Sequence, residues 1–281
     1  MNKNIRVAFS GSGFLAPIHV GAFAAFTDAG FNVVEVAGTS GGSIAAAMIA
    51  AGKTSSQMFE LMLKPLPSGI VGFNPLTLLG SGYGYCNGNV LLNWLMDQIG
   101  ENVTFSNCKI PVTIMSTDIV HAKAFEFSKA THPNTQLAFA CRASSAVPFV
   151  WTPVHMDGGV VLVDGGVINN IPVNKLTADT TTTRFGIQVD DKANDLTKFD
   201  LFSYSKQLIN ILLSANEDTH IDLAVATGAH IIPVATDGLG FLNPRLTDAQ
   251  KTALYQNGYH AVSSFLKTNS YKPTVRRRSA P

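Results

Sequence analysis

A serine set among glycines is the residue of this chain best placed to act as a nucleophile. Ser40 lies in the string GTSGG at Gly38–Gly42, after the extended run Val33–Ala37 and before the small-residue helix predicted at Ser43–Ala51. A G-x-S-x-G string between a strand and a helix is typical of a nucleophile elbow. The N–H of Gly41 and the helix N-terminus would both favour negative charge near the serine. The alternative is that Ser40 only caps the helix in a glycine-rich loop.

A serine nucleophile needs a base, and no histidine of the sequence lies where a base is expected. Sites in open α/β sheets form at the carboxyl ends of the strands. His230 precedes a predicted strand, so it falls at the opposite edge. The histidines within predicted helices are His19, His220 and His260. The sequence therefore favours a base of another residue type.

Asp164 lies where a base for Ser40 is expected, at the carboxyl end of a strand, whereas the histidines do not. It ends the predicted strand Val160–Val163 and is followed by a pair of glycines that allow close approach. Burial of a carboxylate raises its pKa towards the strength of a useful base. The same D-G-G string occurs at Asp157, where it indicates a hairpin turn between two extended runs. We therefore predict a dyad of Ser40 and Asp164 and treat Asp157 as a turn residue.

A second glycine-rich turn, Gly11-Ser12-Gly13, follows the first predicted strand. Its main-chain N–H groups could form the oxyanion hole that a serine nucleophile requires. The string also fits the G-x-G-x-x-A pattern of dinucleotide-binding proteins. That alternative needs an acid near the end of the next strand. Glu35 is the nearby candidate but lies inside its strand, so the oxyanion role is favoured.

Composition limits the classes of function. The 281 residues carry a net charge of +1, and charged residues make up 14%, which is low for a globular protein. This balance gives no basic field for nucleic acid, and the mean hydropathy of +0.19 fits a large core or apolar substrates. The three cysteines lack metal-ligand spacing and are expected to be reduced thiols. No signal peptide or membrane span is evident, and we expect a cytoplasmic protein without metal or cofactor.

Strand and helix signals alternate along the chain, which predicts an α/β fold with a mostly parallel sheet. The absence of repeats and clear linkers favours a single domain over residues 1–281. The expected strands are Ile5–Ser10, Val33–Ala37, Ile110–Ser116, Ala124–Ser128, Val147–Trp151, Val160–Val163, Phe185–Val189 and Ile231–Val234. The expected helices are Pro17–Ala29, Ser43–Ala51, Ser56–Lys64, Val90–Ile99, Asn134–Arg142, Leu201–Ala226 and Asp248–Lys267.

Two segments stand apart from this alternation. Residues 65–88 are rich in glycine and proline yet carry many large apolar side chains. They are interpreted either as a lid or membrane-facing loop, or as an irregular loop packed on the core. Residues 272–281 include Arg276–Arg278 and are expected to be a disordered, solvated tail.

The chain resembles the patatin-like phospholipases over almost its whole length. The resemblance rests on SGSGFLA followed by HVG, GTSGGS, GYCNGNVLLNWL, IPVTIMSTDI, RASSAVPFVW and DGGVINNIPV, and on the ending TDGLGFL…LTDAQKTALYQNGY. It implies a three-layer α/β/α fold with Ser40 as nucleophile and Asp164 as base. It assigns the oxyanion hole to Gly11, Ser12 and Gly13, with the N–H of Gly41.

That resemblance implies a lipid acyl hydrolase, and its glycine loop departs from the usual G-G-G-x-[KR]-G pattern. Ser12, Leu15 and Ala16 replace a glycine, the basic residue and the last glycine. Arg142 is a candidate substitute for the lost charge, or else a structural ion pair. The expected reaction cleaves fatty-acyl esters of phospholipids or lysophospholipids through an acyl-serine, with peripheral membrane contact. An acyltransferase, or a non-catalytic or activator-dependent lipid-binding effector, is the alternative, and an activating partner or ligand is unidentified.

Overall fold

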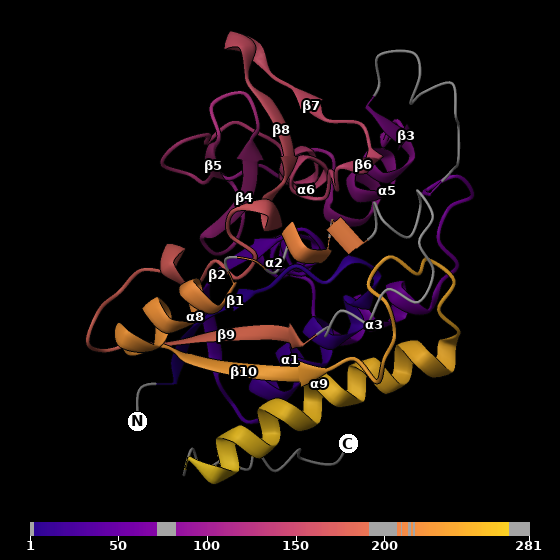
Figure 1. Cartoon of the computed structure of the whole chain (residues 1–281). Coiled ribbons are helices and arrows are strands. Elements are labelled where there is room, and N and C mark those ends of the chain that lie inside the picture. The colour runs from indigo at the N-terminus through magenta and orange to yellow at the C-terminus, as the bar shows by residue number, and fades with distance from the viewer. Residues whose placement is uncertain are drawn as a thin grey trace.

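A sheet of eight strands forms the centre of the protein (Figure 1). The computed structural model describes residues 3–71, 83–190, 207, 208, 210–212, 215 and 217–269. The strand order is β10-β9-β1-β2-β4-β8-β7, and β5 pairs with β4. The strands of this sheet are β1 (Asn4–Phe9), β2 (Asn32–Thr39), β4 (Val112–Asp118), β5 (Lys123–Phe127), β7 (Val154–His155), β8 (Val161–Asp164), β9 (Thr183–Asp190) and β10 (His230–Ala235). A separate pair joins β3 (Gly84–Cys86) to β6 (Phe149–Trp151).

The pairings confirm the predicted α/β fold and locate its antiparallel part. Strands β10, β9, β1, β2 and β4 run parallel to one another. Strands β5 and β8 pair antiparallel with β4, and β7 pairs antiparallel with β8. The β7–β8 connection is the turn Asp157–Gly159, which agrees with the hairpin predicted there.

Strand β4 brings the ends of β2 and β8 together. The first half of β4 pairs with β2, up to Met115 opposite Thr39. The second half pairs with β8, and Ser116 lies opposite Asp164. Strand β5 takes the other edge of β4, since it pairs with Met115 and Ser116 as well. Because β2 is parallel to β4 and β8 is antiparallel, the carboxyl ends of β2 and β8 meet end to end.

The helices begin and end close to the predicted positions. They are α1 (Pro17–Asp28), α2 (Gly41–Ala50), α3 (Ser55–Leu63), α5 (Asn89–Ile99), α6 (Leu137–Ser144), α8 (Glu217–Ala226) and α9 (Asp248–Thr268). Pro17 opens α1, and Thr54 and Thr247 start α3 and α9 with capping boxes. Helix α6 begins three residues later than expected. Of the predicted helix Leu201–Ala226, α8 forms the last part, and residues 201–206, 209, 213, 214 and 216 lie outside the described residues.

Helices cover both faces of the sheet, which gives the expected three layers. Side chains such as Val7 and Phe185 point into the main core, where α1, α2 and α9 pack. Alternate residues such as Ala8 face the other way and pack with Ala224 of α8. In Figure 1, α9 lies along the bottom of the view beside α1.

Two glycines set the close contact between α1 and α9. A Cβ atom on Gly21 would lie 1.9 Å from the carbonyl oxygen of Tyr255, and one on Gly258 would lie 2.0 Å from that of Ile18. Neither position can therefore accept a larger side chain without moving a helix backbone. The long closing helix is held against the helix that follows the glycine-rich loop.

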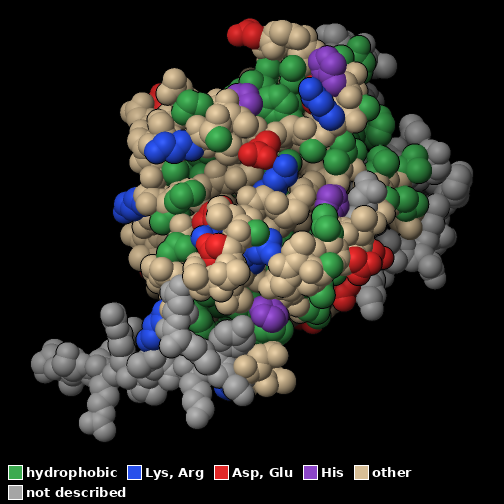
Figure 2. All heavy atoms as spheres, turned by 90° about the vertical axis from the view of Figure 1, so that its left-hand side faces the viewer, with side chains coloured by type: hydrophobic (Ala, Val, Ile, Leu, Met, Phe, Trp, Pro, Cys, Tyr) green, Lys and Arg blue, Asp and Glu red, His purple; other side chains and the backbone are tan. Residues whose placement is uncertain are grey.

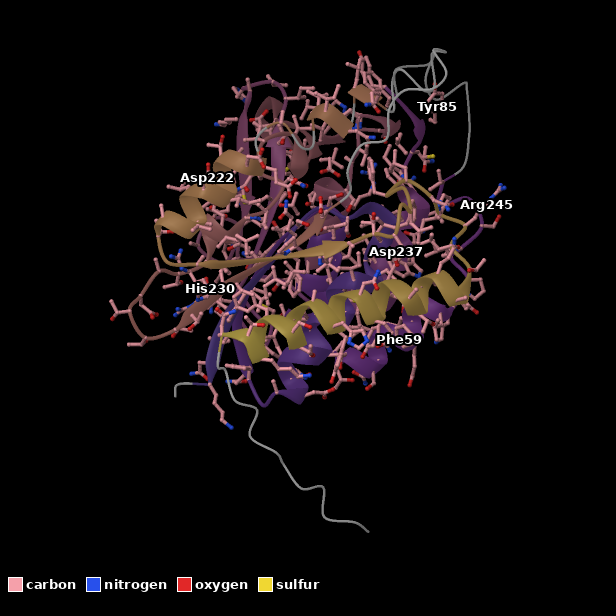
Figure 3. The ribbon with its side chains drawn as sticks, turned by 60° about the horizontal axis from the view of Figure 1, so that its bottom comes forward. Phe59, Tyr85, Asp222, His230, Asp237 and Arg245 are labelled. Carbon is pink, nitrogen blue, oxygen red and sulfur yellow. The ribbon has the colours of Figure 1, made fainter. Side chains whose placement is uncertain are left out.

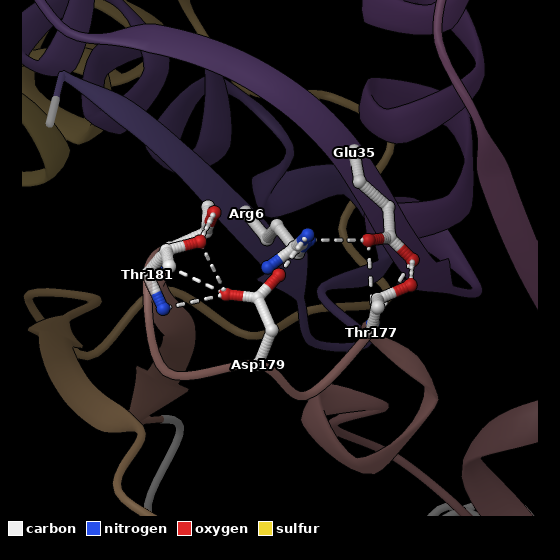
Figure 4. A network of polar contacts seen from close by, with 6 residues as sticks. Arg6, Glu35, Thr177, Asp179 and Thr181 are labelled. Atoms are coloured by element: carbon white, nitrogen blue, oxygen red, sulfur yellow. Dashed lines mark hydrogen bonds and ion pairs between the residues drawn. The ribbon is translucent and has the colours of Figure 1, made fainter.

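A charged network ties the amino edge of the sheet together (Figure 4). Arg6 of β1 lies 2.7 Å from Glu35 of β2 and 2.6 Å from Asp179 in the loop before β9. Glu35 also accepts a hydrogen bond from the N–H of Thr177, and Asp179 accepts one from that of Thr181. The network fixes the loop that leads into β9. It lies away from the edge of the sheet that holds the carboxyl ends of the parallel strands.

The surface and the thiols fit the composition. Figure 2 shows one face of the molecule, on which basic and acidic side chains are interspersed. In the described structure, no disulfide bond involves Cys86, Cys108 or Cys141. None of the described helices combines the length and apolar character needed to cross a membrane.

Candidate active site

Ser40 occupies a strained turn between β2 and α2. Its backbone has φ 51° and ψ −126°, in the region that residues with a side chain rarely adopt. A Cβ atom on Gly38 would lie 2.4 Å from the carbonyl oxygen of Gly42, and one on Gly42 would lie 2.3 Å from that of Ser10, so the turn needs glycine on both sides. The strain lifts the Ser40 side chain out of the sheet at the N-terminus of α2, as in a nucleophile elbow.

The Ser40 hydroxyl donates a 2.6 Å hydrogen bond to Oδ2 of Asp164. The other carboxylate oxygen, Oδ1, accepts a 2.8 Å bond from the N–H of Gly166. Asp164 is completely buried, and this burial raises the pKa of its carboxyl group to about 7. The end-to-end meeting of β2 and β8 on β4 is what brings together two side chains that are 124 residues apart.

Two further serines hold the turn, although no motif in the sequence singles them out. Ser144 accepts a 2.8 Å hydrogen bond from the N–H of Ser40 and donates one of 2.5 Å to the carbonyl oxygen of Met115. Ser43 donates a 2.6 Å bond to the carbonyl oxygen of Ser40. Ser144 thus links the elbow to β4 and is positioned by the buried helix α6. The signal that could have found it is a polar residue on the buried face of that helix.

The Gly11–Gly13 loop lies beside the elbow. A Cβ atom on Gly11 would fall 3.6 Å from Cβ of Ser40, and the N of Gly13 lies 3.0 Å from where a Cβ of Gly41 would stand. The N–H of Gly11 donates to the carbonyl oxygen of Asn170, at 3.0 Å. Ser12 has φ −145°, so a side chain is accepted there without strain. For the N–H groups of Ser12, Gly13 and Gly41, no acceptor is found among the described residues.

The histidines have other roles. His19 is buried, its Nε2 lies 2.9 Å from the carbonyl oxygen of Ser10, and burial lowers its pKa to about 4. His220 contacts the carbonyl oxygen of Ile168 at 2.9 Å. His230 and Asp237 lie at opposite ends of β10 in Figure 3, which puts His230 at the amino edge. The hydroxyl of Ser40 is therefore bonded to a carboxylate and not to an imidazole.

Three candidate functional residues from the sequence lie away from the elbow, namely Asp157, Glu35 and Arg142. Asp157 is exposed in the β7–β8 turn. Glu35 belongs to the network at the amino edge, which removes the acid that dinucleotide binding would need. Arg142 is buried, and it donates to the carbonyl oxygens of Asn87 and Thr152. Arg142 thus bonds loop carbonyls, and no ion pair is found for it within the part of the chain that the structure describes.

A largely apolar cavity opens beside Ser40. Its empty space, which includes part of the open solvent, is about 880 Å³. Apolar side chains on its wall include Phe14, Ile44, Met62, Leu91, Trp94 and Trp151. Lys251 of α9 also lines it. The cavity suits a chain of methylene groups that ends at the serine.

Part of the 65–88 segment belongs to this cavity. Leu66 and Ile70 line its wall, and the carbonyl oxygen of Ile70 accepts a 3.1 Å hydrogen bond from the indole of Trp151. Strand β3 pairs with β6 at the other end of the segment. Residues 72–82, including Phe73 and Leu78, lie outside the described residues, so the lid or membrane-facing role stays a prediction.

The fold and the elbow define an α/β protein in which a serine hydroxyl is bonded to a buried carboxylate. A model of the family described as patatin-like phospholipase matches residues 7–177. That match covers more than half of the chain, and the chain belongs to the patatin-like phospholipase family. Membership supports a lipid hydrolase of phospholipase type, which is the class that the sequence predicted.

Several known proteins are similar to this chain. YqhO of Bacillus subtilis is 26% identical over 94% of this chain and 98% of its own. An NTE family protein of Mycobacterium tuberculosis is 28% identical, over 61% of this chain and 45% of its own length. VipD of Legionella pneumophila has a similar structure, with a TM-score of 0.62 and 15% identity over 94% of this chain and 67% of VipD.

ExoU of Pseudomonas aeruginosa, solved in its heterodimeric complex with SpcU, gives a TM-score of 0.53 at 16% identity. This comparison covers 94% of the present chain and 51% of ExoU. The chain thus spans about half the length of ExoU and of the mycobacterial protein. At these identities the solved structures support the fold alone.

Proposed function

We propose that this protein is a serine acyl hydrolase that cleaves a fatty-acyl ester of a phospholipid or lysophospholipid. The observation that carries the proposal is the 2.6 Å hydrogen bond from the Ser40 hydroxyl to the buried Asp164 carboxylate. A base works best when its pKa is near the working pH, and that of Asp164 is raised to about 7. The adjoining apolar cavity supports an acyl chain as the bound group.

The reaction proceeds by two acyl transfers. Asp164 takes the hydroxyl proton of Ser40 while Ser40 Oγ attacks the acyl carbonyl carbon. The tetrahedral intermediate collapses, the ester C–O bond breaks, and Asp164 returns the proton to the leaving alcohol. Water then attacks the acyl-Ser40 ester and gives its proton to Asp164. Collapse of this second intermediate releases the fatty acid and restores the proton to Ser40.

The oxyanion of each intermediate is held by main-chain N–H groups of Ser12, Gly13 and Gly41. The elbow and the glycine loop lie in contact, and these N–H groups have no acceptor among the described residues. Gly11 acts differently, because its N–H is engaged by Asn170. Its lack of a side chain leaves room for Asn170, since a Cβ atom on Gly11 would lie 2.2 Å from Oδ1 of Asn170. Preorganised donors of this type stabilise developing charge without reorganisation.

The test is product analysis on purified protein with a panel of phospholipids, lysophospholipids and glycerides. We expect free fatty acid from the wild type and none above background from Ser40→Ala. A fluorophosphonate probe should label the wild type at Ser40 and leave the variant unlabelled. Retention of hydrolysis by Ser40→Ala would overturn the proposal. Acyl transfer to an added alcohol in preference to water would replace the hydrolase with an acyltransferase.

Labelling without turnover would add a requirement for an activator. ExoU has been solved in a heterodimeric complex with SpcU, so a protein of this fold can bind a partner protein. In that case the panel is repeated with vesicles and with a cell extract. Failure of both labelling and turnover would leave a non-catalytic lipid-binding role.

A further inference from the structure

Lys251 is the charged residue among those that line the cavity containing Ser40. It projects from the first turns of α9, and its side chain is only 14% exposed. An ammonium group held away from water is costly unless an anion accompanies it. The wall around it consists otherwise of apolar or uncharged residues in the described part of the chain. The cavity thus places one positive charge in an otherwise apolar surrounding.

Lys251 contacts the carboxylate of Asp248, which is a weak partner for its charge. Its Nζ lies 3.3 Å from Oδ1 of Asp248, whose side chain is 72% exposed. Ion pairs with an exposed carboxylate contribute little, because water screens them. An ammonium group has three donors, and this contact occupies one of them. Lys251 therefore keeps the capacity to bind a stronger anion inside the cavity.

The position of Lys251 is fixed by the packing of α9. Gly21 and Gly258 hold α9 against α1 at backbone contact. On the same helix, Tyr255 packs on Phe59 of α3, with ring centroids 4.4 Å apart. Figure 3 shows Phe59 beside α9, and α3 also contributes Met62 to the cavity wall. Lys251 is thus carried by a helix that packs closely on α1 and on the helix that supplies part of the cavity wall.

The glycine-rich loop cannot supply this charge. Leu15, which follows the loop, is uncharged and fully buried in the core. The cavity wall instead meets the loop at Gly13 and Phe14, which are uncharged. A positive charge at this cavity comes from the closing helix, more than 200 residues further along the chain.

We propose that Lys251 binds the phosphate of the glycerophospholipid headgroup while the acyl ester lies at Ser40. The protein would then select phosphate-bearing lipids over neutral glycerides. The inference rests on the proposed hydrolase function and adds a specificity determinant to it. A lysine acts on phosphate as a point charge and makes no demand on headgroup orientation. The rest of the headgroup lies towards solvent.

The experiment compares a short-chain phosphatidylcholine with the diacylglycerol of the same chain length, both as monomers in solution. Soluble substrates separate headgroup binding from binding to a membrane surface. The variants are Lys251→Met, which keeps the length and removes the charge, and Lys251→Arg, which keeps the charge. Lys267→Met is the matched control, because Lys267 is exposed in the last turn of the same helix.

We expect Lys251→Met to raise KM for the phosphatidylcholine about 10- to 100-fold, as loss of a charge-assisted bond would. Its kcat, and both constants for the diacylglycerol, should stay within about twofold of the wild type. Lys251→Arg should retain most of the discrimination, and Lys267→Met should behave as the wild type. Circular dichroism and the melting temperature check that each variant is folded.

Equal losses on both substrates, or no change on either, would overturn the assignment. Relief of inhibition by free fatty acid, with KM unchanged, would also overturn it and would move the role of Lys251 to the product carboxylate. These outcomes differ from failure of the proposed function. In that case Ser40→Ala would remain active, whatever the result at Lys251.

Discussion

Two aspartates at opposite edges of the sheet show how this fold uses one side chain in two ways. Asp164 ends β8 at the carboxyl edge, has no exposed surface and bonds to a hydroxyl and an N–H group. Asp179 lies at the amino edge, is partly exposed and contacts the Arg6 guanidinium at 2.6 Å. Burial raises the pKa of Asp164 to about 7, whereas Arg6 holds that of Asp179 well below its usual range.

The contrast identifies which carboxylate can move a proton. A carboxylate paired with a guanidinium is stable as the anion and is a poor base. A carboxylate that is buried without a cation is destabilised as the anion and accepts a proton readily. The network around Arg6 therefore serves structure, and the isolated Asp164 is suited to chemistry.

The largest expected difference between the two residues is in turnover. Asp164→Asn should lower kcat by roughly 10²- to 10⁴-fold, because the variant lacks the base that activates Ser40. Asp179→Asn should leave kcat within about threefold, since only a structural ion pair changes. Steady-state hydrolysis of a soluble ester measures both. Comparable losses of kcat in the two variants would contradict the assignment of Asp164 as the base and of Asp179 as a structural residue.

The pH dependence of activity is the second comparison. Asp164 must be ionised to act as a base, so kcat/KM should rise with pH and level off above about pH 7. Asp179→Asn should keep the same midpoint, since Asp179 is ionised throughout this range. The measurement is kcat/KM from pH 5 to 9 with the wild type and this variant. A midpoint near pH 4 would mean that the base is a carboxyl group with an ordinary pKa.

Stability should respond to pH in opposite directions at the two sites. The folded pKa of Asp164 is raised, so its contribution to stability is present below about pH 4 and is lost as the pH rises to about 7. The loss is at most about 4 kcal/mol for a shift of this size. The folded pKa of Asp179 is lowered, so its contribution is present above about pH 4 and is lost as the pH falls.

Urea unfolding of the two asparagine variants at pH 5 and pH 8 tests these signs. Asp164→Asn should gain stability relative to the wild type between pH 5 and pH 8. Asp179→Asn should be less stable than the wild type at both pH values. A stability difference between Asp164→Asn and the wild type that does not change with pH would contradict the burial argument.

The smallest effect is expected at Asp157, which shares the D-G-G string with Asp164. Its side chain is exposed in the β7–β8 turn, so Asp157→Asn should leave kcat, KM and the melting temperature essentially unchanged. Initial rates and thermal unfolding are sufficient to check this. Loss of activity in Asp157→Asn with retention in Asp164→Asn would reverse the assignment of the base.

Local pattern was enough to predict much of the fold and of the candidate site. The elbow around Ser40 was visible because its glycines, strand and helix are adjacent in the sequence. Asp164 could be proposed because it follows a short apolar strand. These are features of single segments, and their residue types carry the information.

The rest depends on contacts between distant segments. The end-to-end meeting of β2 and β8 follows from the register of β4, which no local pattern gives. No local pattern predicts the bond between Ser144 and the elbow, the bond from Gly11 to Asn170, or the position of Lys251 of α9 in the cavity wall. No local pattern predicts the charge network at Arg6, because its members come from two strands and a loop.

The pairing of β4 with both β2 and β8 has a consequence for folding during synthesis. Ser40 is made early, but its carboxylate partner follows only after 124 further residues. Pairing of β8 with the second half of β4 closes a long loop, a step that is slow compared with local folding. A nascent chain that has completed the elbow therefore still lacks the carboxylate of the proposed dyad. The proposed hydrolase would gain its base only once β8 has joined the sheet.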